Sequence, residues 1–127
     1  MPTDAVLGAV PMLTPFSLRR RWACLLLAAV IVGLLFYLGS QPMAVGLFPE
    51  PWDKLAHFSV FGALSALLWV GLGGQFSLLV IALMAGVGAL DEWHQAGLSG
   101  RSADYADFLT DVAAATLAVI VLQRWWK

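Results

Sequence analysis

Residues 55–90 read LAHFSVFGALSALLWVGLGGQFSLLVIALMAGVGAL. This stretch contains two apolar runs, 55–72 and 76–90, each near the lower end of the roughly 17–25 residues that a transmembrane helix requires. The segment Gly-Leu-Gly-Gly at 71–74 favours a very short turn between them, because glycine adopts backbone conformations that other residues avoid. The stretch therefore predicts two transmembrane helices that lie side by side and run in opposite directions.

Two further apolar runs flank this helical hairpin, at 22–38 and 108–122. Prolines at positions 42, 49 and 51 separate the first run from the hairpin and prevent one long helix, since proline removes a backbone N–H group and clashes with the preceding turn. The first run follows three arginines, as in a signal peptide, but no small-x-small cleavage pattern follows it, so we expect a retained helix. The predicted fold class is all-α: a polytopic membrane protein with four transmembrane helices, at about 22–38, 55–72, 76–90 and 108–122, in an antiparallel bundle.

Composition supports an integral membrane protein of one domain. Hydrophobic residues make up 61% of the 127 positions and charged residues 12%, with a mean hydropathy of +0.83, whereas soluble domains average roughly 45–50% apolar and about 25% charged residues. A net charge of −1 argues against a nucleic-acid partner, because no basic face is available for phosphates. We expect residues 19–127 to form the four-helix domain and residues 1–18 to form a flexible N-terminal tail.

The orientation in the membrane follows from the rule that cytoplasmic loops carry the excess of Lys and Arg. Five basic residues lie at one end of the predicted bundle and two at the other: Arg19, Arg20, Arg21, Arg124 and Lys127 against Lys54 and Arg101. We therefore expect both termini in the cytoplasm, N-in and C-in, with the opposite end facing the extracytoplasmic side.

Three polar clusters lie at that opposite end: Asp53-Lys54-x-x-His57, Asp91-Glu92-x-x-Gln95 and Arg101-x-x-Asp104-x-x-Asp107-x-x-x-Asp111. Ionisable groups beside hydrocarbon are unfavourable, so their concentration here indicates a function. Positions three, four and seven apart share a helix face, and three such faces could line one pocket, with His57 and Asp111 deepest. The candidate ligand-binding residues are Asp53, Lys54, His57, Asp91, Glu92, Gln95, Arg101, Asp104, Asp107 and Asp111.

Structural roles compete with ligand binding at several of these positions. Asp53 and Asp104 also suit helix N-caps, where a carboxylate accepts backbone N–H bonds. Asp91 and Glu92 lie at a predicted helix C-terminus, which disfavours negative charge, but a solvated outer loop would accommodate them. Arg101 equally suits the neutralisation of nearby acids.

Six acids in these clusters oppose Lys54, Arg101 and, when it is protonated, His57. Near lipid, such an excess must hold protons or bind a cation. Oxygen ligands favour Mg²⁺, Ca²⁺ or Mn²⁺, and one histidine adds a Zn²⁺ alternative. The candidate metal ligands are Asp91, Glu92, Asp107, Asp111 and His57, although His57 also suits an interhelical hydrogen bond. A divalent cation is the only cofactor that the sequence indicates, since it contains no His-Glu-x-x-His or paired Cys/His motif.

In their order and spacing the three clusters resemble the VanZ-like family, named for a teicoplanin-resistance membrane protein. The resemblance runs from Asp53 to about Leu122 and includes Gly100-Arg101-Ser102. Many members resemble an Asp-x-x-x-Asn pattern where this chain has Asp107-x-x-x-Asp111, so an acid replaces an amide there. The resemblance implies a small multi-pass protein of the bacterial cytoplasmic (inner) membrane, linked to the cell envelope and to antibiotic tolerance, and it implies no established reaction.

These observations favour binding of a lipid-linked or glycopeptide-like envelope ligand at the outer membrane face, with a membrane lipid or lipid-linked envelope component as the partner. The alternative is an intramembrane, metal-dependent hydrolase or transferase acting on a lipid headgroup. Its candidate catalytic residues are His57, Glu92 and Asp107, as acid, base or metal ligand, with Arg101 stabilising an anion. A third hypothesis, proton or cation translocation, rests on the acidic excess. The sequence does not indicate an oligomeric state.

Overall fold

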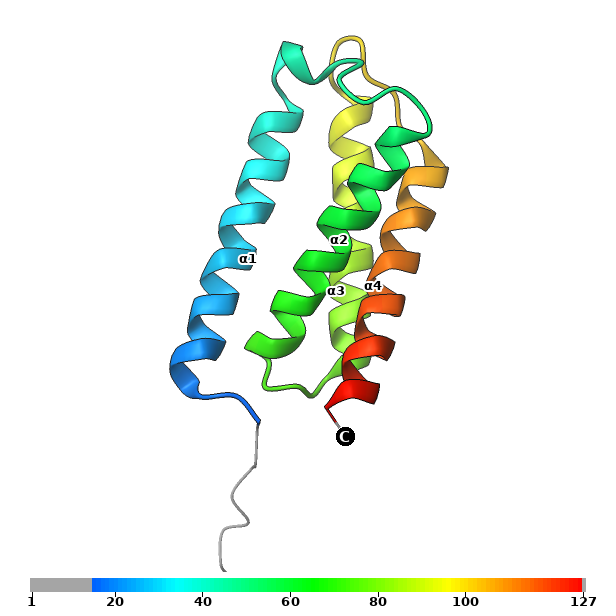
Figure 1. Ribbon diagram of the computed structural model, residues 1–127. Helices are drawn as coiled ribbons and strands as arrows, with labels where there is room; N and C mark the ends of the chain where they lie inside the picture. Colours follow the sequence, from blue (N-terminus) through cyan, green and yellow to red (C-terminus); the bar gives the residue numbers. More distant parts are fainter. Residues whose placement is uncertain (1–14, 127) are drawn as a thin grey trace, which may run out of the picture.

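The computed structural model describes residues 15–126. In this part of the chain four α-helices lie side by side, and consecutive helices run in opposite directions (Figure 1). They are α1 (Leu18–Gly39), α2 (Trp52–Gly71), α3 (Ser77–Ala96) and α4 (Tyr105–Trp125), with a 3₁₀ helix, η1 (Pro42–Ala44), between α1 and α2. Each α-helix is long and apolar enough to cross a membrane, so the predicted all-α class and the four spans are confirmed. The predicted flexible tail falls mainly on residues 1–14, which lie outside the described residues.

Each helix is longer than the apolar run that predicted it. The largest difference at a helix end is in α3, which was expected to end at residue 90 and continues to Ala96, with Gly97 as its C-cap. The apolar run ends at the first charged pair, but the helical hydrogen bonds of the backbone continue. Asp91 and Glu92 therefore lie in the last turns of α3. Both side chains are buried, with 2% and 7% of the residue exposed. The expectation that a solvated outer loop accommodates them is therefore wrong.

The central helix of the bundle is α2, which contacts the other three. Between α2, α3 and α4 the core contains Phe61, Leu64, Met84, Ala114 and Ala115. The two alanines are almost fully buried, and small residues of this kind allow helices in membranes to approach closely.

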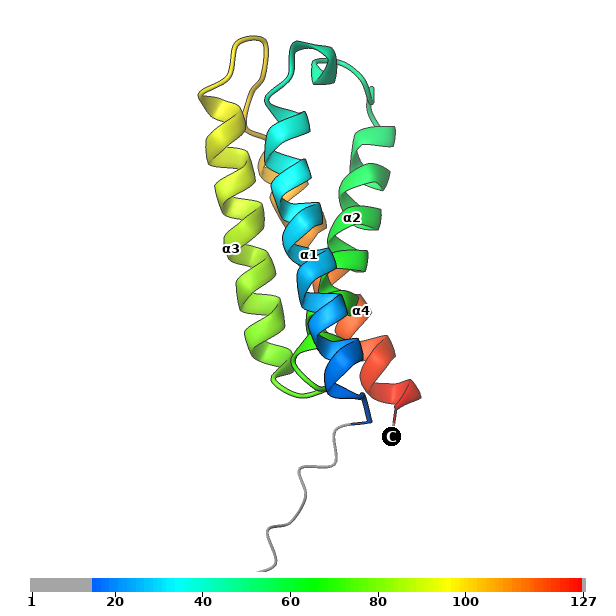
Figure 2. The ribbon, with the colours of Figure 1, turned by 90° about the vertical axis from the view of Figure 1, so that its left-hand side faces the viewer.

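The peripheral helix is α1, which lies across the side formed by α2 and α3 (Figure 2). Ala28 is its only buried residue. Near its N-terminus, Arg21 Nε donates a hydrogen bond to the carbonyl oxygen of Gly71 at 3.1 Å, which ties α1 to the end of α2. Because α1 is so little buried, most of its apolar side chains face either lipid or a cavity.

The connection between α2 and α3 is the short turn that the glycines predicted. Gly73 and Gly74 have φ angles of +85° and +74°, in the left-handed region that favours glycine. A Cβ atom on Gly74 would also lie 3.2 Å from the rings of Phe16 and Trp69. Trp69 Nε1 donates to Ser77 Oγ at 3.2 Å across this turn. The turn is therefore held by packing and by a hydrogen bond between the ends of the two helices.

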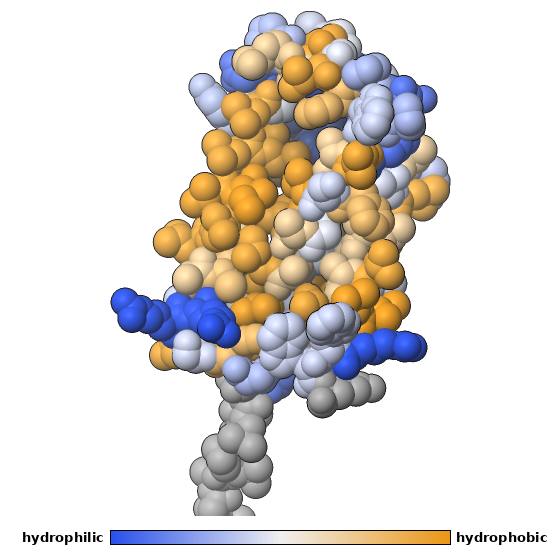
Figure 3. All heavy atoms as spheres, in the orientation of Figure 1, coloured by the Kyte–Doolittle hydropathy of each residue, from blue (hydrophilic) through white to orange (hydrophobic). Residues whose placement is uncertain are grey.

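Apolar residues cover the middle of the bundle on the face shown in Figure 3, and hydrophilic residues gather at its two ends. Large apolar side chains are exposed on the bundle, among them Leu26, Val30, Leu78 and Leu117. In water such a surface would be an interaction site or an aggregation hazard. In a bilayer it is the surface that lipid chains cover.

Candidate functional site

The three polar clusters converge at the end of the bundle opposite to the described chain ends, beneath the connections α1–α2 and α3–α4 (Figure 1). Helix α2 contributes His57, α3 contributes Glu92, and α4 contributes Asp107 and Asp111. Glu92, Asp107 and Asp111 are buried and His57 is partly buried. The spacing rule explains the convergence, since Asp107 and Asp111 are one turn apart on the face of α4 that meets α2.

Lys54 lies at the centre of one half of this site. Its Nζ atom lies 2.9 Å from Asp53 Oδ2, 2.8 Å from Asp104 Oδ2 and 2.6 Å from Asp107 Oδ1, with Glu50 Oε1 at 3.4 Å. The contact with Asp107 is an ion pair whose angles depart from those of a hydrogen bond. One ammonium group thereby joins the start of α2 to the start of α4.

Asp104 is the N-cap of α4, as predicted, and its Oδ1 accepts a hydrogen bond from the backbone N–H of Ala106 at 2.9 Å. The hydrogen bond from Lys54, followed by that from Ala106, holds the pKa of the Asp104 carboxyl below its usual value. Asp53 is not an N-cap. Pro51 takes that position, and Asp53 lies in the first turn of α2.

His57 joins α2 to α4 in the other half of the site. Its Nδ1 lies 2.8 Å from Asp111 Oδ1, and its Nε2 lies 3.6 Å from Asp107 Oδ2. The imidazole ring also stacks on Phe61, with an angle of 10° between the rings. The interhelical hydrogen bond considered for His57 is therefore present, and it leaves Nε2 without a close hydrogen bond.

Three carboxylate oxygens in the site are buried and have no hydrogen-bond partner among the described residues: Glu92 Oε1, Asp107 Oδ1 and Asp111 Oδ2. Of these, Asp107 Oδ1 forms the ion pair with Lys54. The other Glu92 oxygen accepts the backbone N–H of Asp104 at 2.6 Å. Asp111 Oδ2 faces Gly88 of α3, where an added Cβ would lie 3.0 Å from it. Gly88 is a site residue that the sequence analysis missed, because a glycine within an apolar run carries no signal of the partner it accommodates.

Asp91 and Gln95 form a local pair near the end of α3. Gln95 Nε2 donates to Asp91 Oδ2 at 3.1 Å, as expected for polar residues four apart on a helix. Both residues are buried, yet both contribute to the lining of a cavity at this end of the bundle.

A cavity of about 630 Å³ lies between α1, α2, α3 and the two connections at this end. One side is apolar and is formed mainly by Ile31, Leu34, Leu35, Leu38, Met43, Leu47 and Phe48. The other side contains seven of the ten predicted ligand-binding residues: Asp53, His57, Asp91, Gln95, Arg101, Asp104 and Asp107. Lys54, Glu92 and Asp111 lie outside this lining. The cavity therefore has an apolar side and a polar side, and the volume is in the range of small-molecule sites.

Arg101 is the unpaired cation of the cavity. Within residues 15–126, its guanidinium group makes no hydrogen bond or ion pair, although it lines the cavity and lies close enough to influence Asp91 electrostatically. Arginine presents several donors in a planar fork that suits carboxylates and phosphates. The neutralisation of nearby acids expected of Arg101 therefore has no direct ion pair among the described residues.

The apolar side of the cavity comes from residues that sequence reasoning did not include in the site. They lie on α1 and around η1, and hydropathy assigned them to lipid contact or to a surface loop. No sequence signal separates a leucine that faces a cavity from one that faces lipid, because both sit in the same apolar run.

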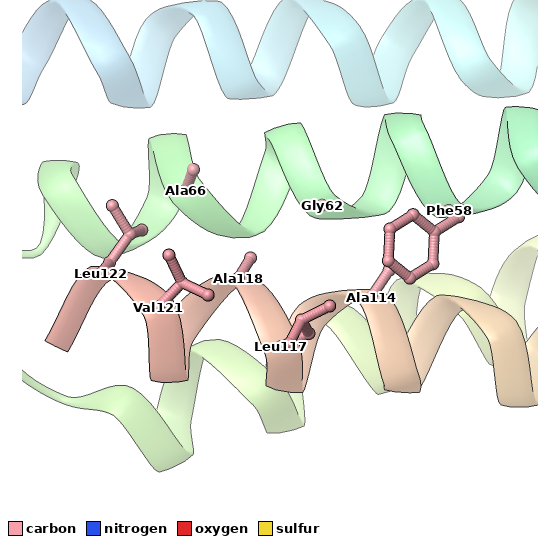
Figure 4. A pocket seen from close by; sticks show the side chains of 8 residues that line it. All are labelled: Phe58, Gly62, Ala66, Ala114, Leu117, Ala118, Val121 and Leu122. Carbon is pink, nitrogen blue, oxygen red and sulfur yellow. The ribbon is translucent and has the colours of Figure 1, made fainter. Parts of the chain in front are cut away.

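A second hollow, of about 280 Å³, lies along α2 and α4 (Figure 4). Small residues such as Gly62, Ala66 and Ala118 open it, and Phe58 and Leu117 border it. None of its lining residues is ionisable, so it offers lipid contact rather than chemistry.

Two groups of acidic and histidine side chains bring ligand atoms within 4.8 Å of one another: His57, Glu92 and Asp107, and separately Glu50, Asp53 and Asp104. Three of the five predicted metal ligands form the first group. Asp91 and Asp111 belong to neither group. Asp91 is hydrogen-bonded to Gln95, and Asp111 to His57.

Four candidate spans around a buried acidic cluster define a multi-pass membrane protein with a polar site at one end of the bundle. A comparison with protein families matches residues 3–126 to the VanZ/LLP1 family. The chain therefore belongs to the VanZ/LLP1 family, as its motifs predicted. Searches of curated proteins and of solved structures return no match.

Proposed function

We propose that this protein binds an amphiphilic, lipid-linked molecule of the bacterial cell envelope, with the chain of the ligand on the apolar side of the cavity and its headgroup on the polar side. The observation that carries the proposal is one cavity lined by Leu34, Leu35 and Phe48 on one side and by His57 and Arg101 on the other. A soluble polar ligand would not need the apolar side of the cavity, and an ordinary lipid chain would not need the polar side.

The orientation is part of the proposal. The end of the bundle remote from the site is basic: the first turn of α1 contains Arg19, Arg20 and Arg21, and the last turn of α4 contains Arg124. The positive-inside rule assigns that end to the cytoplasm. The cavity would then open towards the extracytoplasmic side of the bacterial cytoplasmic membrane, where lipid-linked envelope precursors and glycopeptide antibiotics are both accessible.

The headgroup is expected to carry an anionic group. Arg101 offers free donors within the cavity, whereas the surrounding carboxylates repel an anion that does not contact it. A phosphate-bearing headgroup has the negative charge and the two neighbouring oxygens that a planar guanidinium group binds with parallel hydrogen bonds. We therefore expect affinity to depend on Arg101 and on the presence of phosphate.

A binding assay with matched variants tests the proposal. The probes are a short-chain polyprenyl phosphate and the corresponding polyprenyl alcohol, titrated against purified protein in detergent. Leu34→Trp fills the apolar side of the cavity, and Leu117→Trp makes the same change on the lipid-facing hollow; the two leucines are 47% and 50% exposed. Only the first variant should weaken binding of the phosphate. Equal affinities of the wild type and both variants, or equal affinity for the alcohol and the phosphate, would contradict it.

A second function has one observation in its favour, the approach of His57, Glu92 and Asp107. This set suits a metal-dependent hydrolase in which water attacks the terminal phosphorus of a headgroup diphosphate. The bond from that phosphorus to the bridging oxygen breaks, inorganic phosphate leaves, and the freed oxygen of the lipid monophosphate takes a proton from the water. Phosphate release from a polyprenyl diphosphate, lost in Glu92→Gln and retained in Glu50→Gln, is its test. The third hypothesis, translocation, has no comparable support, because the ionisable residues described within α2 and α3 lie only at the site end.

A further inference from the structure

We propose that His57, Glu92 and Asp107 bind one divalent transition-metal ion, Zn²⁺ or Mn²⁺, at the polar side of the cavity. One ligand atom from each of the three side chains lies within 4.8 Å of the other two. They come from three different helices, so a bound ion would join α2, α3 and α4 at a single point.

The spacing of the free atoms suits an ion rather than a direct contact. His57 Nε2 and Asp107 Oδ2 are 3.6 Å apart, which is too long for a hydrogen bond between them. Two ligands of a tetrahedral ion with metal–ligand distances near 2.1 Å lie about 3.4 Å apart. A shift of a few tenths of an ångström therefore converts the observed pair into two coordinating atoms.

Asp111 prepares His57 for this role. When Nδ1–H of His57 donates to Asp111 Oδ1, at 2.8 Å, the lone pair of the ring lies on Nε2, on the side of Asp107. Metal-binding histidines commonly donate a hydrogen bond from the N–H of their second ring nitrogen to a carboxylate in this way, which fixes the orientation of the ring. Asp111 is thus a positioning residue and not a ligand.

Glu92 provides an independent observation in favour of a bound ion, because one of its buried carboxylate oxygens has no partner among the described residues. The residue is 93% buried, its Oε2 is held by the N–H of Asp104, and its Oε1 has no partner among the described residues. A buried carboxylate oxygen without a donor or cation is strongly unfavourable. A metal ion next to His57 and Asp107 would satisfy it.

The second acidic group does not qualify, since a cation of the protein already fills it. Lys54 Nζ lies within 3.4 Å of all three members, Glu50, Asp53 and Asp104. The same ammonium takes Asp107 Oδ1 at 2.6 Å and so leaves Oδ2 for the proposed ion.

The ligand set determines the kind of ion. One imidazole nitrogen and two carboxylate oxygens suit Zn²⁺ or Mn²⁺ better than Mg²⁺ or Ca²⁺, which prefer oxygen alone. Three protein ligands leave at least one coordination position open. His57 and Asp107 both line the cavity, so an oxygen of a bound phosphate could occupy that position while Arg101 binds another. This role for the ion rests on the proposed function, whereas metal binding itself does not.

Calorimetric titration of the metal-stripped, purified protein with Zn²⁺ and with Mn²⁺ tests the site without any lipid ligand. We expect one equivalent of at least one of the two ions to bind. Glu92→Gln and His57→Gln should weaken binding about 100-fold or more, since even residues behind a metal ligand affect affinity roughly 10–100-fold. Glu50→Gln and His94→Gln make the same chemical changes at residues that are not ligands of the proposed ion and should bind as the wild type does.

Two results would overturn the proposal: no binding of either ion to folded wild-type protein, or equal losses in Glu50→Gln and Glu92→Gln. The wild-type titration does not depend on any variant folding, and circular dichroism of each variant verifies its helices. Metal binding with no polyprenyl phosphate binding would confirm this site and contradict the proposed function, and the reverse pattern would do the opposite.

Discussion

The Gly88→Ala substitution tests the packing that places Asp111 beside His57. A Cβ atom at position 88 would lie 3.0 Å from Asp111 Oδ2 and 3.3 Å from Asp111 Cβ. Asp111 cannot retreat easily, because its Cβ is one bond from the backbone of α4 and its carboxylate is held by His57 at 2.8 Å. Overpacking of this kind destabilises a protein by about 1–3 kcal/mol.

Gly86 offers a matched control on the same helix. An added Cβ there meets nothing within 4 Å, so only the helix preference of alanine over glycine remains, which favours alanine by up to about 1 kcal/mol. The two substitutions are chemically identical and two residues apart. We therefore expect effects of opposite sign from Gly86→Ala and Gly88→Ala.

The assay is unfolding in mixed micelles by increasing fractions of a denaturing detergent, followed by circular dichroism. Gly88→Ala should lower the free energy of unfolding, and it should also weaken Zn²⁺ or Mn²⁺ binding because the orientation of His57 changes. If Gly88→Ala proves as stable as Gly86→Ala, the close contact between α3 and Asp111 is refuted.

Three further predictions concern the charges of the site. Lys54→Met should lower the free energy of unfolding by about 2–4 kcal/mol, because it leaves the buried Asp107 carboxylate without its cation; the Lys54 side chain itself is one-quarter exposed, which limits the effect. Arg124→Met, at an exposed helix end, should change the free energy of unfolding little. Equal effects of the two substitutions would contradict this role of Lys54. The lowered pKa of Asp104 means that its ion pair stabilises the fold above the usual pKa of an aspartic acid and is lost as the pH falls through the lowered value. Asp104→Asn should therefore reduce the loss of stability on acidification, and an unchanged pH profile would count against it. Asp111→Asn introduces the amide that the resemblance associates with this position. It should keep the hydrogen bond to His57 but weaken metal binding roughly 10–100-fold. An unaltered metal affinity in the titration would show that the charge of Asp111 does not affect metal binding by His57.

The sequence predicted the helices because each apolar run is long enough to span a membrane, and the glycines at 71–74 predicted the turn between α2 and α3. It also predicted that the polar clusters meet, because residues three, four and seven apart share a helix face. Hydropathy could not predict the helix ends. It changes at the first charged residue, whereas the backbone of α3 continues for six residues past Leu90.

Two parts of the site depend on the tertiary structure and could not be predicted. The first is which charged groups pair with each other: Lys54 contacts four carboxylates, and His57 contacts Asp111 rather than Asp53. Both outcomes depend on the rotation of each helix about its axis. The second is the apolar side of the cavity on α1, where Leu34 and Leu35 are indistinguishable in sequence from the leucines that face lipid.

His57 has a structural and a proposed functional role at once. Its bond to Asp111 fastens α2 to α4, and the same bond directs its other nitrogen towards Asp107 and the cavity. Removing the side chain would therefore disturb both the packing and the site, so variants on either side of it, such as Glu92→Gln, separate the two roles more cleanly.

Lipid binding in the cavity can be tested directly by photo-crosslinking with a polyprenyl phosphate that carries a photoreactive group on its chain. After irradiation in proteoliposomes, mass spectrometry identifies the labelled residues. Binding in the cavity predicts labels concentrated on residues 31–38 of α1 and 43–48 around η1, reduced by excess unlabelled polyprenyl phosphate. Labels spread evenly over the lipid-facing surface, including residues 117–122 of α4, and unaffected by the competitor would contradict binding in the cavity.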